Sequence, residues 1–166
     1  DTLETMVSPE VFGRLAASQT KQILRQKIRE AEKEALYNAF ADKKDEIITG
    51  IVDRVEPRFA IINIGKTGAF LPLTHQIPNE KLREGQNIKV YVTEVENNSK
   101  GTHVNVSRTV PQLVKRLFEN EVPEIKQGVV LVKGIARDPG QRTKIAIYSE
   151  DPMVDAVGAC VGNKGA

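Results

Sequence analysis

The chain has 166 residues, 40% of them hydrophobic and 28% charged, a balance typical of a soluble globular protein. No apolar run approaches the roughly 20 residues of a membrane helix, and the single cysteine, Cys160, excludes an internal disulfide and favours a reducing cytoplasm. The 24 basic and 22 acidic residues leave a net charge of only +2, so any nucleic-acid contact has to come from local clusters of cations and aromatic rings. His75 and His103 have no accompanying cysteine cluster, so neither a structural zinc nor another cofactor is expected.

The first predicted element is a long helix over residues 9–41. Ser8 is its expected N-cap and Pro9 its first helical residue. Apolar residues recur at helical spacing as far as Phe40, opposite a charged face, although Gly13 is a candidate interruption. An amphipathic helix needs a cover for its apolar stripe. It is therefore interpreted as the end of a larger N-terminal domain, as a stalk that packs on a partner, or as a solvated linker helix.

Five short β-branched segments over residues 46–109, separated by turn signals, predict a small closed barrel of the oligonucleotide-binding type. Alternation assigns one aliphatic set to the barrel interior: Ala60, Ile62, Ile64, Ala69, Leu71, Ile88, Val90 and Val92. The aromatic residues Phe59, Phe70 and Tyr91 then lie outside. There they either stack on bases or pack under a neighbouring domain, and both readings remain open.

The segment from Gly65 to Gly68 contains Gly-Lys-Thr but is not expected to bind a nucleotide. A nucleotide-binding phosphate loop needs a glycine five residues before its Gly-Lys pair, where this chain has Ala60. The residues after Thr67 also continue as a strand. The segment is interpreted as a turn in which Lys66 remains a candidate phosphate contact. No catalytic set of side chains stands at motif spacing, so the protein is not expected to be an enzyme.

The last third of the chain predicts a partial α/β domain. A helix begins at Pro111, a hairpin turns at Pro139-Gly140, and a further helix is expected with Asp151 as its N-cap and Pro152 in its first turn. Helix, two strands, helix and a GxxG loop is the order that opens a K-homology (KH) domain of the prokaryotic type. Glycines in such a loop allow close approach of a nucleic-acid backbone. The candidate RNA contacts here are Gly162, Asn163, Lys164 and Gly165.

Together these segments resemble the NusA family of bacterial transcription elongation, termination and antitermination factors. The most specific blocks are FENEVPEI (residues 118–125) and ARDPGQRTKIAI (residues 136–147). The resemblance implies a multidomain α and β protein: a helical end of an RNA polymerase-binding N-terminal domain at 1–44, an S1 barrel at 45–109 and the start of the first KH domain at 110–166. It also implies that the sequence is part of a longer protein, with further chain on both sides.

For function, the resemblance implies a non-enzymatic cytoplasmic factor that modulates pausing, termination and antitermination. Its implied partners are the RNA polymerase core, nascent single-stranded RNA and other antitermination factors. The resemblance adds His75 and Arg108 to Phe59 and Phe70 on the RNA face of the barrel. Two alternatives stay open: an S1-KH subunit of an RNA-degrading assembly, and a protein-interaction scaffold. RNA binding that weakens steeply as the salt concentration rises would identify phosphate contacts and exclude the scaffold alternative.

Overall fold

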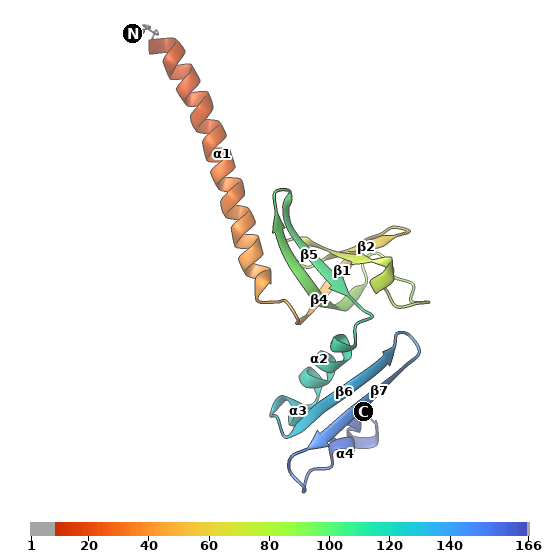
Figure 1. Cartoon of the computed structure of the whole chain (residues 1–166). Helices are drawn as coiled ribbons and strands as arrows, with labels where there is room; N and C mark the ends of the chain where they lie inside the picture. The colour runs from red at the N-terminus through yellow and green to blue at the C-terminus, as the bar shows by residue number, and fades with distance from the viewer. Residues whose placement is uncertain (1–8, 166) are drawn as a thin grey trace, which may run out of the picture.

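The computed structural model describes residues 9–165, which begin with a helix, α1 (Pro9–Ala41), that projects well beyond the rest of the molecule (Figure 1). The expected N-cap, Ser8, lies outside the described residues. The helix runs through Gly13 without a break. Only its last turns pack on the barrel, through buried Phe40 and half-buried Leu36. Within the described residues, no helix has the length and apolar character required to cross a membrane.

The predicted barrel is confirmed, with five strands: β1 (Ile47–Val55), β2 (Phe59–Asn63), β3 (Gly68–Pro72), β4 (Asn87–Asn98) and β5 (Gly101–Ser107). Their order around the barrel is β1-β2-β3-β5-β4, and a parallel β3–β5 pair closes it. The predicted interior positions are buried except Ile64, which is half-buried against the same cluster. Gly50 of β1 lies against β2: a Cβ there would be 2.5 Å from the Cγ2 of Ile62 and 2.9 Å from the carbonyl oxygen of Asn63, so only glycine fits.

The C-terminal unit consists of α2 (Pro111–Glu121), α3 (Pro123–Lys126), the hairpin β6 (Val130–Asp138) and β7 (Arg142–Ser149), α4 (Ala156–Val161) and a short 3-10 turn (Asn163–Gly165). All three helices pack in one apolar cluster with the hairpin residues Val130, Val132 and Ile147. The helices therefore share one face of the hairpin. No other element in residues 9–165 contributes to a cluster on the opposite face.

The last helix begins later than the sequence predicts. Asp151 and Pro152 lie in a turn, in which the Asp151 carboxylate accepts a hydrogen bond of 2.8 Å from the backbone N–H two residues on. α4 starts at Ala156 and its N-cap is Asp155, whose Oδ1 accepts from the N–H of Val157 at 3.1 Å. The predicted cap at Asp151 was wrong because an Asp-Pro pair suits a turn as well as a helix start.

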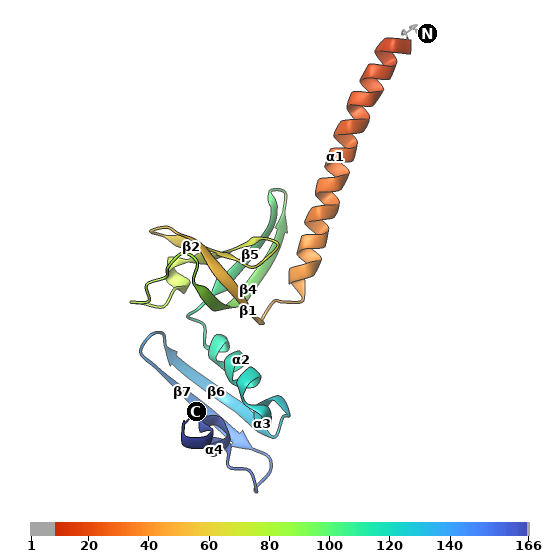
Figure 2. The ribbon, with the colours of Figure 1, turned by 180° about the vertical axis from the view of Figure 1, so that it is seen from behind.

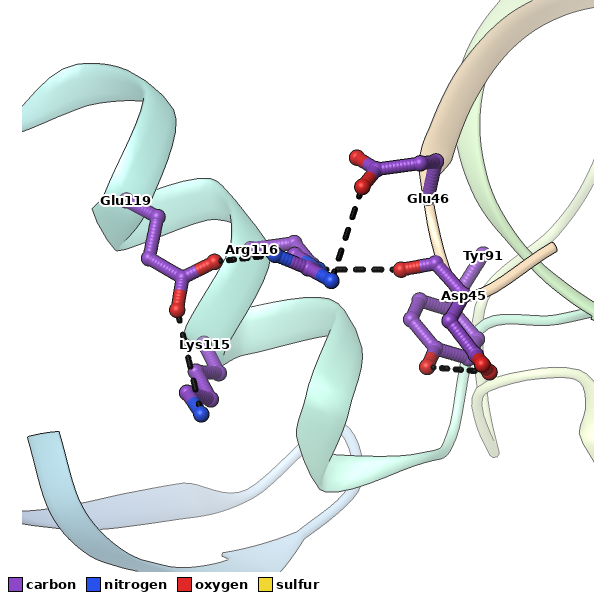
Figure 3. A network of polar contacts seen from close by, with 6 residues as sticks. All are labelled: Asp45, Glu46, Tyr91, Lys115, Arg116 and Glu119. Atoms are coloured by element: carbon purple, nitrogen blue, oxygen red, sulfur yellow. Dashed lines mark hydrogen bonds and ion pairs between the residues drawn. The ribbon is translucent and has the colours of Figure 1, made fainter. Parts of the chain in front are cut away.

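Polar contacts of α2 join the barrel to the C-terminal unit, and the two ribbon views show these as separate lobes (Figures 1 and 2). Arg116 donates from Nε to the carbonyl of Asp45 at 2.9 Å, and its Nη2 lies 3.5 Å from the carboxylate of Glu46 (Figure 3). Glu119, one turn along α2, accepts from the same guanidinium at 2.8 Å. This hydrogen bond raises the pKa of Arg116. These contacts hold the C-terminal unit in its orientation relative to the barrel.

Candidate nucleic-acid interface

Two aromatic rings lie side by side on the outer surface of the barrel, on the neighbouring strands β2 and β3. In the antiparallel register Phe59 is opposite Pro72 and Phe70 is opposite Ile61, which places the two rings on a diagonal. Their centroids are 5.2 Å apart and their planes are inclined by 36°. Phe70 is 40% exposed and Phe59 is half-buried. Exposed rings on such a barrel offer a platform for stacked bases.

His75 lies beside this pair, in the short 3-10 turn that follows β3. Its Nδ1 is 2.8 Å from the hydroxyl oxygen of fully buried Ser107, which orients the imidazole ring. Phe70 and His75 line one surface groove of about 250 Å³, in which Glu94 is the charged residue. An acidic residue in the groove suits bases better than phosphates. We call Phe59, Phe70 and His75 the aromatic surface.

Arg108 adjoins His75 through its backbone but not through its side chain. Its N–H donates to the His75 carbonyl at 2.9 Å, whereas the guanidinium turns to Glu80 and forms two hydrogen bonds of 2.6 and 2.9 Å. The side chain is only 15% exposed. It lines a groove of about 350 Å³ between the lobes, together with Arg137. Burial, and then the charge of Arg108, lowers the pKa of Arg137. The structure does not bring Arg108 to the aromatic surface.

Neither a nucleotide-binding loop nor a group of three or more metal-ligating side chains occurs in residues 9–165. Lys66 is exposed in a turn that is closed by a 3.0 Å hydrogen bond from the N–H of Ile64 to the carbonyl of Thr67. β3 follows directly at Gly68, so the helix that a nucleotide-binding loop requires is missing here. The interpretation as a turn is confirmed. Lys66 lies at the opposite end of the β2–β3 pair from Phe59.

Tyr91 does not contribute to the aromatic surface. Its side chain is only 7% exposed, and its hydroxyl donates to the carboxylate of Asp45 at 3.0 Å (Figure 3). Burial, with a further contribution from Asp45, raises the pKa of Tyr91 to about 12. Of the two readings that the sequence left open for Tyr91, the structure shows packing under a neighbouring part of the chain, because Asp45 and α2 cover this part of β4.

The GxxG loop follows α4 directly, and all four of its residues are exposed. Gly162 has φ 73° and ψ 177°, a combination that side-chain-bearing residues avoid, and Gly165 has φ 77°. Lys164 takes the left-handed conformation with φ 55°. The predicted residues Gly162, Asn163, Lys164 and Gly165 thus lie together on one loop. Two positions without side chains flank a cation, so a phosphate backbone has room to approach.

Sequence reasoning missed two sets of cations. Arg142 and Lys144 alternate along β7 and are exposed on the hairpin face away from the helices. Their spacing of two residues along a strand is visible in the sequence. The sequence does not show which face of the hairpin the helices cover, so it does not show that these two cations are exposed. Arg116 and Arg137 were also missed. Their hydrogen bonds connect residues 71 and 27 positions apart, and no local pattern marks such contacts.

Comparison with protein families matches three models in succession along the chain. The NusA N-terminal domain matches residues 1–34, the S1 RNA binding domain matches residues 41–107, and the NusA-like first KH domain matches residues 108–166. The S1 match contains the aromatic surface, and the KH match contains the GxxG loop. Both candidate surfaces therefore fall in domains whose family descriptions fit them.

Three curated relatives carry the name transcription termination/antitermination protein NusA. The chain is 50% identical to the protein of Halalkalibacterium halodurans, 48% to that of Bacillus subtilis and 43% to that of Thermus thermophilus. Each alignment covers 99% of this chain. The chain spans only 43–44% of the length of these relatives.

Proposed function

The chain belongs to the NusA family, and we propose that it is the RNA-binding and polymerase-contacting part of a transcription factor that modulates pausing, termination and antitermination. Its proposed partners are nascent single-stranded RNA, the RNA polymerase core and other antitermination factors. We place this activity in the cytoplasm. It consists of binding alone, without a catalysed reaction.

The observation that carries this proposal is the exposure of two different RNA-suited surfaces on one chain. The aromatic surface on the barrel presents rings beside His75. The loop from Gly162 to Gly165 presents backbone and one lysine. The aromatic surface suits bases, and the GxxG loop suits phosphates. Together they suit single-stranded RNA, because bases and phosphates are both accessible in a single strand.

Each surface alone supports only modest affinity. A base stacked on an aromatic side chain contributes about 1–3 kcal/mol, and the net charge of +2 adds little long-range attraction. Two weak sites on one strand reinforce each other, because the first contact raises the effective concentration of RNA at the second. We therefore expect affinity to depend on both surfaces.

Contact with polymerase is assigned to α1 and the residues before it, where the NusA N-terminal domain model matches. Leu15, Ile23, Leu24 and Ile28 on α1 are each more than half exposed. These apolar side chains gain stability when another protein surface covers them. The exposed stripe also suits the scaffold alternative, and the salt dependence of RNA binding distinguishes the two.

Fluorescence anisotropy of a short labelled single-stranded RNA, measured over a salt series, tests the RNA-binding part of the proposal. Phe70→Ala removes the exposed ring, and Gly162→Asp places a carboxylate in the GxxG loop. We expect Phe70→Ala to weaken binding about 5- to 150-fold, equivalent to the loss of one stacked base. Gly162→Asp should weaken binding and reduce its salt dependence.

The control is Met153→Ala, which truncates a side chain that is 90% exposed and outside both surfaces. It should bind RNA like the wild type. If the wild-type chain binds no RNA even at low salt, or if neither Phe70→Ala nor Gly162→Asp changes binding, the proposed function is wrong. Binding that is indifferent to salt would support the scaffold.

A further inference from the structure

The face of the β6–β7 hairpin that points away from the helices carries an unusual set of side chains. Residues directly opposite each other in the hairpin share a face, and Lys144 is opposite Ala136 while Arg142 is opposite Asp138. Tyr148 lies further along the same side of β7 and is 54% exposed. Lys133, at the bulge of β6, places its Nζ 5.5 Å from the centroid of the Tyr148 ring. We call Lys133, Arg142, Lys144 and Tyr148 the outer hairpin face.

The positive charge of this face is not neutralised within the described part of the chain. Lys133, Arg142 and Lys144 are exposed, and none of them forms an ion pair within residues 9–165. A shallow groove of about 340 Å³ at the hairpin tip is lined by Arg142 and Lys144 of this face, with Asp138 as its acidic residue. Arg137 also borders the groove, but it is opposite Thr143 on the helix-covered face and donates to the carbonyl of Val110. Lys133, Arg142 and Lys144 against the single carboxylate of Asp138 leave a local charge that fits a polyanion.

The outer hairpin face is separate from the GxxG loop. α4, which the loop follows directly, packs on the helix-covered side through Ala159 and Cys160, and Gly162 lines a groove with Phe118 of α2. Arg142 and Lys144 point to the other side of the same two strands. The face is therefore not an extension of the GxxG contact, and a ligand that reached both would have to pass around an edge of the hairpin.

We propose that the outer hairpin face is a second binding surface for the phosphate backbone of single-stranded RNA. Arg142 and Lys144 are two residues apart on a strand, so their Cα atoms are separated by about 6.6 Å, similar to the spacing of successive phosphates in an extended strand. The guanidinium of Arg142 can hold a phosphate through two parallel hydrogen bonds. Tyr148, partly covered by Lys133, offers a ring edge to a neighbouring base. This inference rests on the proposed function, since it requires that the chain binds RNA.

The test compares the salt dependence of RNA binding by the wild-type chain and by the double variant Arg142→Gln/Lys144→Gln. Each phosphate contact to a single strand contributes about 0.7 to the slope of log affinity against log salt. Loss of two contacts should reduce the magnitude of that slope by about 1.4 and weaken binding most at low salt. Anisotropy of a labelled mixed-sequence RNA between about 50 and 200 mM salt provides the measurement.

The matched control is Lys21→Gln/Arg25→Gln on exposed α1, which removes the same two charges at a distance from the hairpin. It should keep the wild-type slope.

A double hairpin variant that also keeps the wild-type slope overturns the inference, while RNA binding by the wild type would still support the proposed function. Absence of RNA binding by the wild type overturns both. Labelled poly-glutamate that binds more tightly than RNA, and loses this binding in the hairpin variant, would assign the face to an acidic polypeptide instead. Circular dichroism confirms that the variants are folded.

Discussion

Tyr91 connects the barrel to the segment that follows α1. Its side chain, on β4, is buried, and its hydroxyl donates to the Asp45 carboxylate at 3.0 Å. Asp45 has a positive φ of 63°, a conformation that costs free energy for a residue with a side chain, so the contact helps to retain it. The carbonyl of the same Asp45 accepts from Arg116. The hydroxyl of Tyr91 therefore helps to hold Asp45, the residue at which the barrel contacts α2.

Tyr91 should make stability depend on pH in the alkaline range. Its pKa is about 12 in the folded chain against 10.0 for an unperturbed tyrosine, so the folded state holds the proton more tightly. The stabilisation is complete below about pH 10 and is lost as the pH rises towards 12. We expect the free energy of urea unfolding to fall less steeply across this window in Tyr91→Phe than in the wild type.

Tyr148→Phe is the control for this measurement, because Tyr148 is exposed and belongs to the other lobe. It should show the wild-type decline. Lysine titration in the same pH range is common to all three proteins and cancels in the comparison. An equal decline in Tyr91→Phe and the wild type would contradict the assignment.

At the scale of the element, α1 is a long helix attached at one end. Phe40 is buried in the barrel cluster, and the Thr102 hydroxyl donates to the carbonyl of Lys33 at 3.1 Å. Nearer the N-terminus of the helix, the exposed ion pair of Lys27 and Glu30 contributes only a few tenths of a kcal/mol. Most helical stability in proteins comes from a packed face. The last turns of α1 therefore hold the helix to the barrel.

Shortening a side chain near the C-terminal end of α1 or at its middle should have very different effects on stability. Phe40→Ala leaves a cavity in the barrel cluster and should lower the free energy of unfolding by about 3–5 kcal/mol. Leu24→Ala truncates an exposed side chain and should change it by no more than about 0.5 kcal/mol. Urea unfolding followed by circular dichroism measures both. Similar losses in the two variants would show that something covers Leu24, at the middle of α1, in the isolated chain.

At the scale of the whole molecule, polar contacts across the junction hold the two lobes in their relative orientation. Arg116 binds Asp45 and Glu46 across the junction (Figure 3), and Lys89 lies 3.4 Å from the carboxylate of Glu121. Exposed ion pairs of this kind contribute between 0 and about 1 kcal/mol each. Small polar interfaces allow domains to move. The junction should therefore control orientation more than stability.

Replacement of Arg116 tests this view of the junction. Arg116→Met should change the free energy of unfolding by less than about 1 kcal/mol but let the lobes tumble more independently. NMR relaxation of backbone amides measures the tumbling of each lobe. Lys115→Met is the control, since within residues 9–165 Lys115 forms an ion pair only with Glu119 on the same helix. If the two lobes tumble as independently of each other in Lys115→Met as in Arg116→Met, Arg116 does not hold the junction.

The elements predicted well from the sequence are those that depend on local patterns. Ala60 and Ile62 were assigned to the barrel interior from a period of two, and the structure buries both. The Pro139-Gly140 turn and the hairpin around it were likewise predicted, because these turn residues carry their own backbone preferences. The GxxG loop was found in the same way. These features follow from neighbours in the chain, so the sequence by itself determined them.

Other features were decided only by tertiary structure. The sequence left open whether Tyr91 stacks on bases or packs under a neighbouring domain, and only the structure shows that Asp45 and α2 cover it. Arg108 was expected beside the aromatic rings and instead binds Glu80, 28 residues away. The basic alternation along β7 became informative only when the helices were seen to cover the opposite face. Which side of a strand is exposed depends on what packs against it, and that is a property of the folded chain.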